Sequence, residues 1–162
     1  MTFDQKTFRR ALGSFATGVT IVTGKTDAGE LIGMTVSSFN SVSLNPPLVL
    51  FSLDRQAASS AHWERMEHYA VNVLDRAQLA LCERFAKPGT DKWREVEHVP
   101  GGNGAPILSG SLAVFECRRW ATYDGGDHII LVGEVQQIDA REDGAPLLFH
   151  GGAFKSVAGL EN

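Results

Sequence analysis

Apolar and polar positions alternate along most of the chain, and this pattern predicts more strands than helices. Six segments rich in β-branched and aromatic residues are predicted strands: 19–24, 31–39, 48–53, 69–74, 111–123 and 128–138. Polar turns join neighbouring strands at residues 25–29 and at the sequence DGGD, residues 124–127. Such hairpins favour antiparallel pairing. We therefore predict a mainly β fold, closed or nearly closed into a barrel with a few flanking helices.

Three segments are predicted to be helical. Thr2 followed by Gln5 fits a capping box, and the apolar residues after it recur at helical spacing, which indicates an amphipathic first helix. Residues 57–67 are predicted to form a second helix. Asp75 is predicted to cap a third helix that ends near Phe85.

Other segments carry weaker signals. The apolar run LVLFSL at 48–53 predicts a strand that is buried on both faces. Residues 87–106 are rich in glycine, proline and charge, so we expect a long surface loop. Cys82 and Cys117 are the only cysteines, and we predict that both are buried structural thiols.

Length and composition restrict the class of protein. A chain of 162 residues is the size of one domain, which we predict spans 1–162. A net charge of −4 argues against binding to nucleic acid, because phosphate backbones need clustered Lys and Arg. The N-terminus has scattered charges without an apolar signal region, and every apolar run is far shorter than the roughly 20 residues of a membrane span. We expect a cytoplasmic protein that does not contact a membrane.

Several catalytic motifs are missing from the sequence. The glycines of GGNG at 101–104 lack the strand before and the helix after that a Rossmann phosphate loop requires. No P-loop and no G-x-S-x-G motif occurs. His62 and His68 are six residues apart, which would place them on different faces of a helix. We predict no metal site, since no ligand spacing typical of one is present.

The segment GMTVSSFNSVSLNPP at 33–47 carries hydroxyl side chains where apolar ones would bury better. In one interpretation, these hydroxyls and nearby backbone N–H groups form a neutral cradle for a phosphate or a polar ring edge. In the other, they lie on the solvated face of an edge strand, with Val36, Phe39 and Val42 turned inward. The pattern alone leaves both interpretations open.

Two further positions are candidates for chemistry. His128 follows the turn YDGGD and leads into an apolar strand, where it can donate a hydrogen bond, exchange a proton or orient an amide. The alternative is a surface histidine beside Asp127. The end of the third helix, with Arg84, Phe85 and Lys87, offers an aromatic face and cations, or else a core Phe with solvated charges.

Four segments, in this order and spacing, resemble the short-chain flavin reductases, the reductase components of two-component flavin-dependent monooxygenases. The segments are GMTVSSFNSVSLNPPLVLFSL, YAVNVL, ERFA and GDHIILVGEV, and the resemblance runs from about residue 8 to about residue 154. It implies an FMN-binding split barrel, which is a Greek-key antiparallel β-barrel with flanking helices. It also implies a homodimer with the flavin in a groove near the subunit interface.

The resemblance also implies the binding residues. It places FMN or FAD against Thr35, Val36, Ser37, Ser38, Phe39, Ser41, Val42, Ser43, Ser52, Ser59, Ser60, Phe85 and Ala86. It places NADH or NADPH against Asp127, His128, His150 and Phe154, with His128 as the catalytic or substrate-positioning residue beside the nicotinamide. Relatives often carry an arginine after the histidine of the C-terminal motif, whereas Gly151 and Gly152 follow His150 here. The choice between NADH and NADPH therefore stays open, as does that between FMN and FAD.

The implied activity is an NAD(P)H:flavin oxidoreductase, of EC 1.5.1 type, which supplies reduced flavin to a separate flavin-dependent monooxygenase. A Rossmann domain is not needed for this activity, since the nicotinamide can stack on the flavin ring. The alternative is a flavin- or haem-binding split-barrel protein that does not turn over NAD(P)H, because related folds carry different functions. A third possibility is a structural interaction domain that binds no flavin.

Overall fold

Antiparallel strand pairing organises the computed structural model, which describes residues 2–89 and 91–158. Seven strands form the main sheet in the spatial order β3-β2-β6-β9-β10-β5-β4. Their bounds are β2 Thr20–Lys25, β3 Leu31–Val36, β4 Asn40–Leu44, β5 Pro47–Asp54, β6 His68–Val73, β9 Ala113–Gly125 and β10 His128–Ala140. All pairs in this sheet are antiparallel. The predicted strands and both hairpin turns are confirmed.

Two small sheets and four helical segments complete the described fold. The bounds of the small strands are β1 Thr17–Gly18, β7 His98–Pro100, β8 Pro106–Leu108, β11 Leu148–His150 and β12 Ala153–Lys155. The helical segments are α1 Gln5–Gly13, α2 Ser60–Arg65, the 3-10 turn η1 Arg76–Gln78 and α3 Leu79–Ala86. Because β7 pairs with β8, the prediction of an unbroken loop over 87–106 is wrong for its second half. None of the helices in the described residues is both long and apolar enough to cross a membrane.

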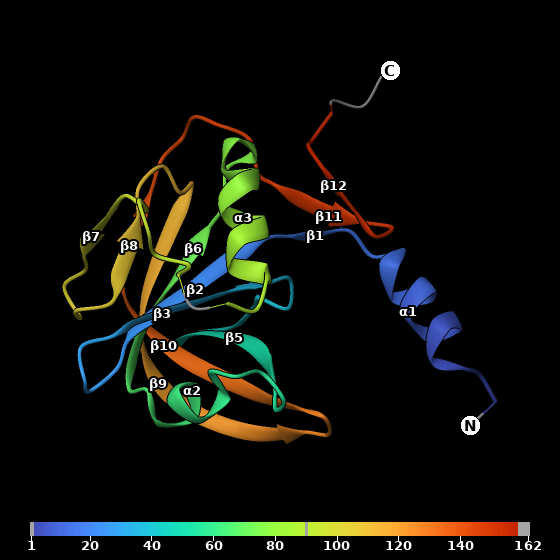
Figure 1. The fold of residues 1–162 in the computed structure, drawn as a ribbon, viewed down its shortest axis with the longest axis horizontal. Coiled ribbons are helices and arrows are strands. Elements are labelled where there is room, and N and C mark those ends of the chain that lie inside the picture. The colour runs from blue at the N-terminus through green and yellow to red at the C-terminus, as the bar shows by residue number, and fades with distance from the viewer. Residues whose placement is uncertain (1, 90, 159–162) are drawn as a thin grey trace.

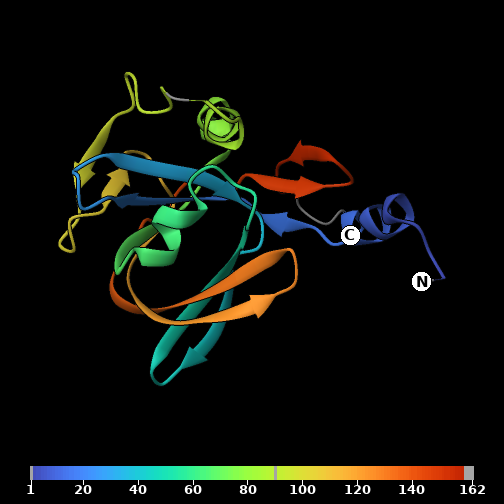
Figure 2. The same cartoon turned by 60° about the horizontal axis from the view of Figure 1, so that its bottom comes forward.

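The main sheet curls into a barrel with helices outside it (Figures 1 and 2). Its edge strands β3 and β4 follow each other in the chain and are joined by residues 37–39. Trp63 of α2 is fully buried and meets Phe51 of β5 edge to face, with ring centroids 6.2 Å apart. On the other side, Cys82 and Phe85 of α3 are buried in a second apolar cluster. The apolar side chains of these helices therefore cover parts of the barrel core that the strands alone would leave exposed.

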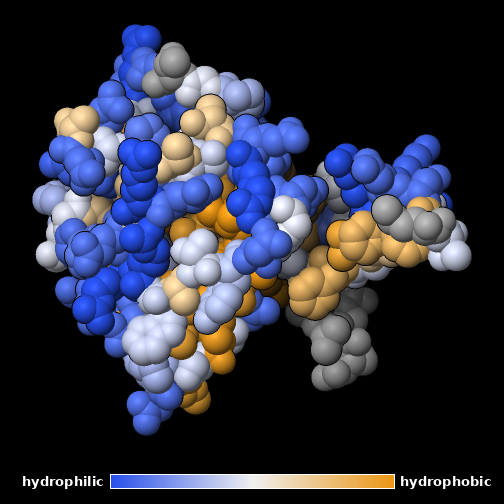
Figure 3. Space-filling model, turned by 90° about the horizontal axis from the view of Figure 1, so that it is seen from below, coloured by the Kyte–Doolittle hydropathy of each residue, from blue (hydrophilic) through white to orange (hydrophobic). Residues whose placement is uncertain are grey.

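The first helix lies apart from the barrel (Figures 1 and 2). Asp4 is its N-cap and accepts a hydrogen bond from the Thr7 N–H at 2.6 Å, so the predicted capping box of Thr2 and Gln5 is wrong. No α1 residue is buried, and Phe8 and Leu12 are at least half exposed. The apolar side of this helix is visible at the right of Figure 3. The predicted amphipathic pattern is present, but apart from Phe3, whose ring lies 5.6 Å from that of Phe8, its apolar side stays largely exposed in the described chain.

Strand β5 alternates in burial, so the prediction of burial on both faces is wrong. Val49, Phe51 and Leu53 point into the core, whereas Leu50 and Ser52 are only partly buried. The wall of the barrel is a single sheet at this point, so successive side chains face opposite environments. This alternation places Ser52 on the face away from the core.

Both cysteines are buried and free, as predicted. Burial raises the pKa of the Cys117 thiol to about 12, and burial also raises the pKa of the Cys82 thiol. Their thiols therefore stay protonated at neutral pH.

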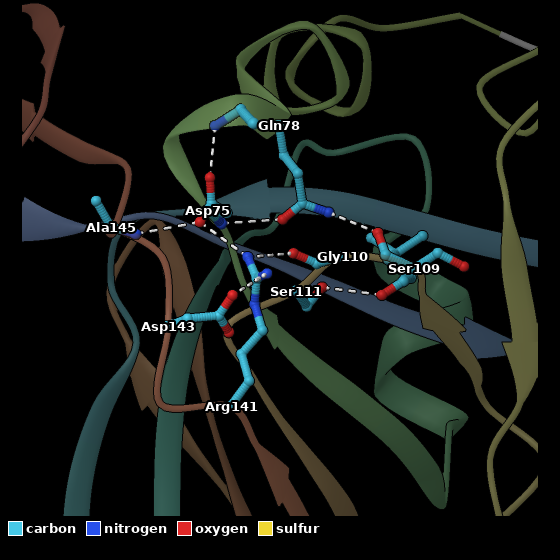
Figure 4. A network of polar contacts seen from close by, with 10 residues as sticks. Asp75, Gln78, Ser109, Gly110, Ser111, Arg141, Asp143 and Ala145 are labelled. Carbon is cyan, nitrogen blue, oxygen red and sulfur yellow. Dashed lines mark hydrogen bonds and ion pairs between the residues drawn. The ribbon is translucent and has the colours of Figure 1, made fainter.

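Asp75 connects the start of η1 to residues 141–145, which are distant in sequence (Figure 4). Its carboxylate accepts hydrogen bonds from the Ala77 N–H at 2.8 Å and the Ala145 N–H at 3.2 Å, and pairs with Arg141 at 2.8 Å. Asp75 caps the 3-10 turn η1, and α3 follows, so the predicted direct cap of an α-helix is corrected to this arrangement. The backbone N–H of Asp75 donates to the side chain of Gln78, which completes a capping box.

Replacing Asp75 by Asn is expected to lower the free energy of unfolding by about 1–2 kcal/mol near neutral pH. The hydrogen bond from the Ala77 N–H, with further contributions from Ala145 and Arg141, holds the pKa of Asp75 below its usual value. A carboxyl whose pKa is depressed on folding stabilises the protein above its unfolded pKa of about 3.9, and this stabilisation is lost as the pH falls through the folded pKa. Urea unfolding of both proteins should show the difference near neutral pH and its loss in acid.

The control variant is Glu134→Gln, which breaks the more exposed ion pair with Arg118 and should change stability by less than about 0.5 kcal/mol. A difference between wild type and Asp75→Asn that does not shrink in acid would contradict the role of the charge.

Candidate functional site

A cavity of about 1020 Å³ lies beside the edge strand β3. Its walls are β3 and the residues after it, the end of β5, the start of α2, and α3 with the loop that follows. The volume is at the upper end of the range usual for ligand sites, about 300–1,000 Å³. Nine of the predicted site residues line it: Thr35, Val36, Ser37, Ser38, Ser52, Ser59, Phe85, Ala86 and His128. The fold thus gathers residues from five separate segments around one cavity.

Gly33 allows α3 to lie directly against β3. A Cβ atom at this position would lie 2.5 Å from Cε1 of Phe85, closer than atoms can approach, and 3.3 Å from Cζ2 of Trp93, which is already a tight contact. Phe85 is fully buried and packs edge to face on Trp93, with centroids 5.0 Å apart. The missing side chain therefore determines how closely the third helix and its loop approach the sheet, and with them one wall of the cavity.

Two of the predicted hydroxyls hold the protein itself together. The Thr35 hydroxyl donates to the Cys82 carbonyl at 2.7 Å and so ties β3 to α3. The Ser38 oxygen accepts from the Ser52 N–H at 2.9 Å and donates to the Ser52 carbonyl at 3.3 Å. Since each hydroxyl has one hydrogen to give, neither of these can donate to a ligand while the contact persists.

Three other hydroxyls in the cavity keep their hydrogens available. Ser59 accepts from the Trp63 indole N–H at 3.2 Å, so its own O–H can still donate. The side chains of Ser37 and Ser52 make no recorded hydrogen bond to the described residues. The backbone N–H groups of Ser37 and Ser38 likewise donate to no described backbone carbonyl. The cavity therefore presents several neutral donors, which suits an anionic or polar ligand.

His128 lies at the rim of the cavity, where β10 begins. Its Nδ1 is 2.7 Å from the Asp127 carboxylate. The hydrogen bond to His128, together with the charge of its ring, lowers the pKa of Asp127. Because Asp127 engages Nδ1, the other ring nitrogen, Nε2, is the one left for a ligand.

The remaining predicted site residues lie outside this cavity in the single chain. They are Phe39, Ser41, Val42, Ser43, Ser60, Asp127, His150 and Phe154. Phe39 packs on Phe115, with centroids 5.5 Å apart, whereas Val42 is 48% exposed, so the interpretation that turned Val42 inward is wrong. Phe154 pairs with Phe149 in the small sheet of β1, β11 and β12. Their predicted contacts with a ligand stay predictions.

Sequence reasoning missed part of the cavity wall. Asp54, His62, Lys92 and Trp93 also line it, and so does Lys87, which the sequence already indicates as a candidate cation. Lys92 is half-buried, donates to the Phe85 carbonyl at 2.9 Å and makes no ion pair with any carboxylate among the described residues. Burial lowers the pKa of its ammonium group. The sequence indicates these cavity residues only through the charge and aromatic content of 87–93, within a segment that is predicted to be a surface loop.

No group of three or more His, Cys, Asp or Glu that could hold a metal ion is found in residues 2–89 and 91–158. The geometry is that of an antiparallel barrel with a cavity at its edge whose donors are compatible with an anion. Its apolar wall, with Val36, Leu53 and Phe85, suits a flat ring, and its free donors suit polar groups attached to the ring. This donor set fits a flavin nucleotide.

Comparison with known proteins shows the family to which this chain belongs. The family described as "Flavin reductase like domain" matches residues 12–158, so the chain belongs to the flavin reductase family. The chain is 46% identical over 151 residues to an FMN reductase (NADH) of Agrobacterium fabrum, covering 93% of this chain and 85% of that protein. It is 39% identical to the flavin-dependent monooxygenase reductase subunit HsaB of Rhodococcus jostii, covering 95% and 78% of the two chains.

Solved structures agree with the fold. The NADH:FAD oxidoreductase of Streptomyces globisporus, in complex with NAD and FAD fragments, superposes with a TM-score of 0.91 at 38% identity. The match covers 96% of this chain and 93% of that one. The predicted split-barrel fold is thereby confirmed.

The two kinds of hydroxyl in the cavity should respond differently to removal. Thr35→Val is expected to lower the free energy of unfolding by about 1 kcal/mol, because the Cys82 carbonyl loses its donor. Ser37→Ala should change it by less than about 0.5 kcal/mol, because the Ser37 side chain is exposed and contacts no described polar group. Urea unfolding measures both, and equal losses would contradict the distinction.

Proposed function

We propose that the chain is an NAD(P)H:flavin oxidoreductase of EC 1.5.1 type. It transfers a hydride from NADH or NADPH to FMN or FAD, and the reduced flavin serves a separate flavin-dependent monooxygenase. The observation that carries the proposal is the cavity that brings free hydroxyl donors, an apolar wall and His128 together, in a chain 46% identical to an FMN reductase (NADH). The family and the NAD- and FAD-fragment complex of a structural neighbour support it.

The chain's own residues bind and orient. Ser37, Ser52 and Ser59 donate hydrogen bonds to the polar and anionic groups of the flavin, and Thr35 and Ser38 hold β3, α3 and β5 in place around it. A bound flavin supplies the ring that accepts the hydride. No strong acid or base is needed, because holding two reactants at contact distance already lowers the barrier by several kcal/mol.

His128 orients the hydride donor in this proposal. Asp127 fixes the ring through Nδ1, and Nε2 contacts the carboxamide of the nicotinamide. The apolar residues Leu53 and Ala57 line the same cavity. His150 and Phe154 lie outside the cavity of one chain, so a contact with the dinucleotide would have to come from its far end or from a second subunit.

A homodimer is part of the proposal. Exposed apolar side chains support it, on α1 with Phe8 and Leu12, and on β4 with Val42 and Leu44. Leu44, at the end of β4, is 94% exposed, which is unusual for a leucine in a strand. The single domain over 1–162 and the cytoplasmic location stay predictions.

The direct test is a titration of the protein with FMN and FAD, followed by NADH and NADPH oxidation in absorbance. Flavin binding with flavin-dependent oxidation supports the proposal. Flavin binding without oxidation would instead indicate a binding protein. No binding and no flavin effect on the melting temperature would refute both, because a bound ligand must stabilise the fold.

His128→Ala is expected to raise KM for NADH about tenfold and to leave the Kd for FMN within about twofold, since the imidazole contacts the donor and not the flavin. Steady-state kinetics and fluorescence titration measure the two constants. Asp127→Asn, which keeps a hydrogen bond to the ring but removes the charge, should have a smaller effect on KM. Unchanged kinetics in His128→Ala would remove this residue from the site.

A further inference from the structure

The turn between β9 and β10 is held by one residue from another segment, Arg55. The backbone N–H of Arg55 donates to the Asp127 carbonyl at 3.1 Å. Its guanidinium donates from Nε to the Gly126 carbonyl at 3.1 Å and pairs with the Asp124 carboxylate. One arginine thus contacts three of the four residues at 124–127. Figure 1 shows this hairpin tip in orange at the lower right, close to the loop that follows β5.

Inside the hairpin, Asp124 and Gly125 pair with Ile129 and His128, but outside it the turn has few other contacts. Asp124, Gly125, Gly126 and Asp127 are all exposed, and Gly126 has φ +78°, a conformation that other residues rarely adopt. Within residues 2–89 and 91–158, Arg55 provides all recorded hydrogen bonds to this turn from outside the hairpin. Exposed hairpin tips with few contacts open easily. The contacts from Arg55 therefore fix the tip relative to the segment that follows β5.

The main effect of these contacts is to fix the position of the turn, and the charge of the ion pair matters less. The guanidinium and the Asp124 carboxylate are 42% and 80% exposed, and solvent screening leaves an ion pair at such a site little effect on stability. The bond to the Gly126 carbonyl is different, because the planar guanidinium holds a backbone atom in a fixed direction. A lysine at position 55 could replace either the hydrogen bond to the Gly126 carbonyl or the ion pair with Asp124, but not both.

The tip carries the candidate donor-binding residues. Asp127 belongs to the turn itself, and His128 follows it as the first residue of β10, directly opposite Asp54 in the ladder. Arg55 is the next residue after Asp54, so its contacts extend the β5–β10 pairing by one step into the turn. A shift of the tip would move the His128 ring, which the Asp127 carboxylate holds through Nδ1.

We propose that Arg55 is a positioning residue for the hydride donor: it anchors the 124–127 turn so that the Asp127–His128 pair faces the cavity. This inference rests on the proposed function. Arg55 does not line the cavity, and it acts on the donor through the turn. Its loss should weaken the use of NADH and leave flavin binding unchanged, because the Arg55 side chain contacts the 124–127 turn and makes no hydrogen bond to Ser37, Ser52 or Ser59.

The test compares Arg55→Gln with a matched control, Arg118→Gln. Arg118 of β9 also pairs with a carboxylate, that of Glu134 on β10, and is 47% exposed. It lies far along this hairpin from the turn. Arg55→Gln is expected to raise KM for NADH about fivefold to tenfold, with the Kd for FMN within about twofold. Arg118→Gln should leave both within about twofold. Arg55→Lys should fall between wild type and Arg55→Gln.

Hydrogen exchange provides a second readout that does not depend on activity. The amides at 126–128 should exchange about tenfold faster in Arg55→Gln than in wild type, and at the wild-type rate in Arg118→Gln. An unchanged KM for NADH in Arg55→Gln would overturn the inference, whatever the exchange rates. Parallel losses of NADH use and FMN binding would also overturn it, by showing a general structural role. A wild-type protein without NADH oxidation would refute the proposed function instead.

Discussion

The close approach of α3 to β3 at Gly33 is the constraint on which the cavity depends. Phe85 and Trp93 occupy the space that a side chain at Gly33 would fill. The Thr35 hydroxyl then joins the same strand to the Cys82 carbonyl at 2.7 Å. An edge strand normally exposes unpaired backbone groups, and covering it with a helix is one way to protect it. Here the same helix also forms one wall of the cavity, so protection of the edge and construction of the site are a single arrangement.

The hydroxyls of the 33–47 segment have divided roles. The hydroxyls of Thr35 and Ser38 donate to protein carbonyls, whereas the Ser37 hydroxyl has its hydrogen available. Ser41 and Ser43 lie on β4, outside the cavity. Neutral donors of this kind can hold an anionic nucleotide on a chain whose net charge is −4. The half-buried ammonium of Lys92 adds one positive charge to the same cavity. The site is thus less neutral than its serines suggest.

The sequence predicted the strands and the hairpins well, because alternation and turn residues are local signals. It failed where the outcome depends on distant contacts. The burial of β5 depends on what covers each face, and the pairing of β7 with β8 joins residues across a glycine-rich loop. The position of the β4 serines depends on where the chain turns after Ser38. Trp93 lines the cavity because it packs near Gly33, and Lys92 because it bonds to the Phe85 carbonyl, and no local pattern reveals either contact.

The burial of both cysteines has a consequence for the protein's chemical durability. Thiol oxidation proceeds through the thiolate, and burial keeps Cys117, with a pKa of about 12, and Cys82 in the protonated form. A reduced flavin that escapes its partner reacts with dioxygen and yields peroxide. An enzyme that releases such a product is exposed to the peroxide that forms from it. Its buried, protonated thiols protect it from oxidative inactivation.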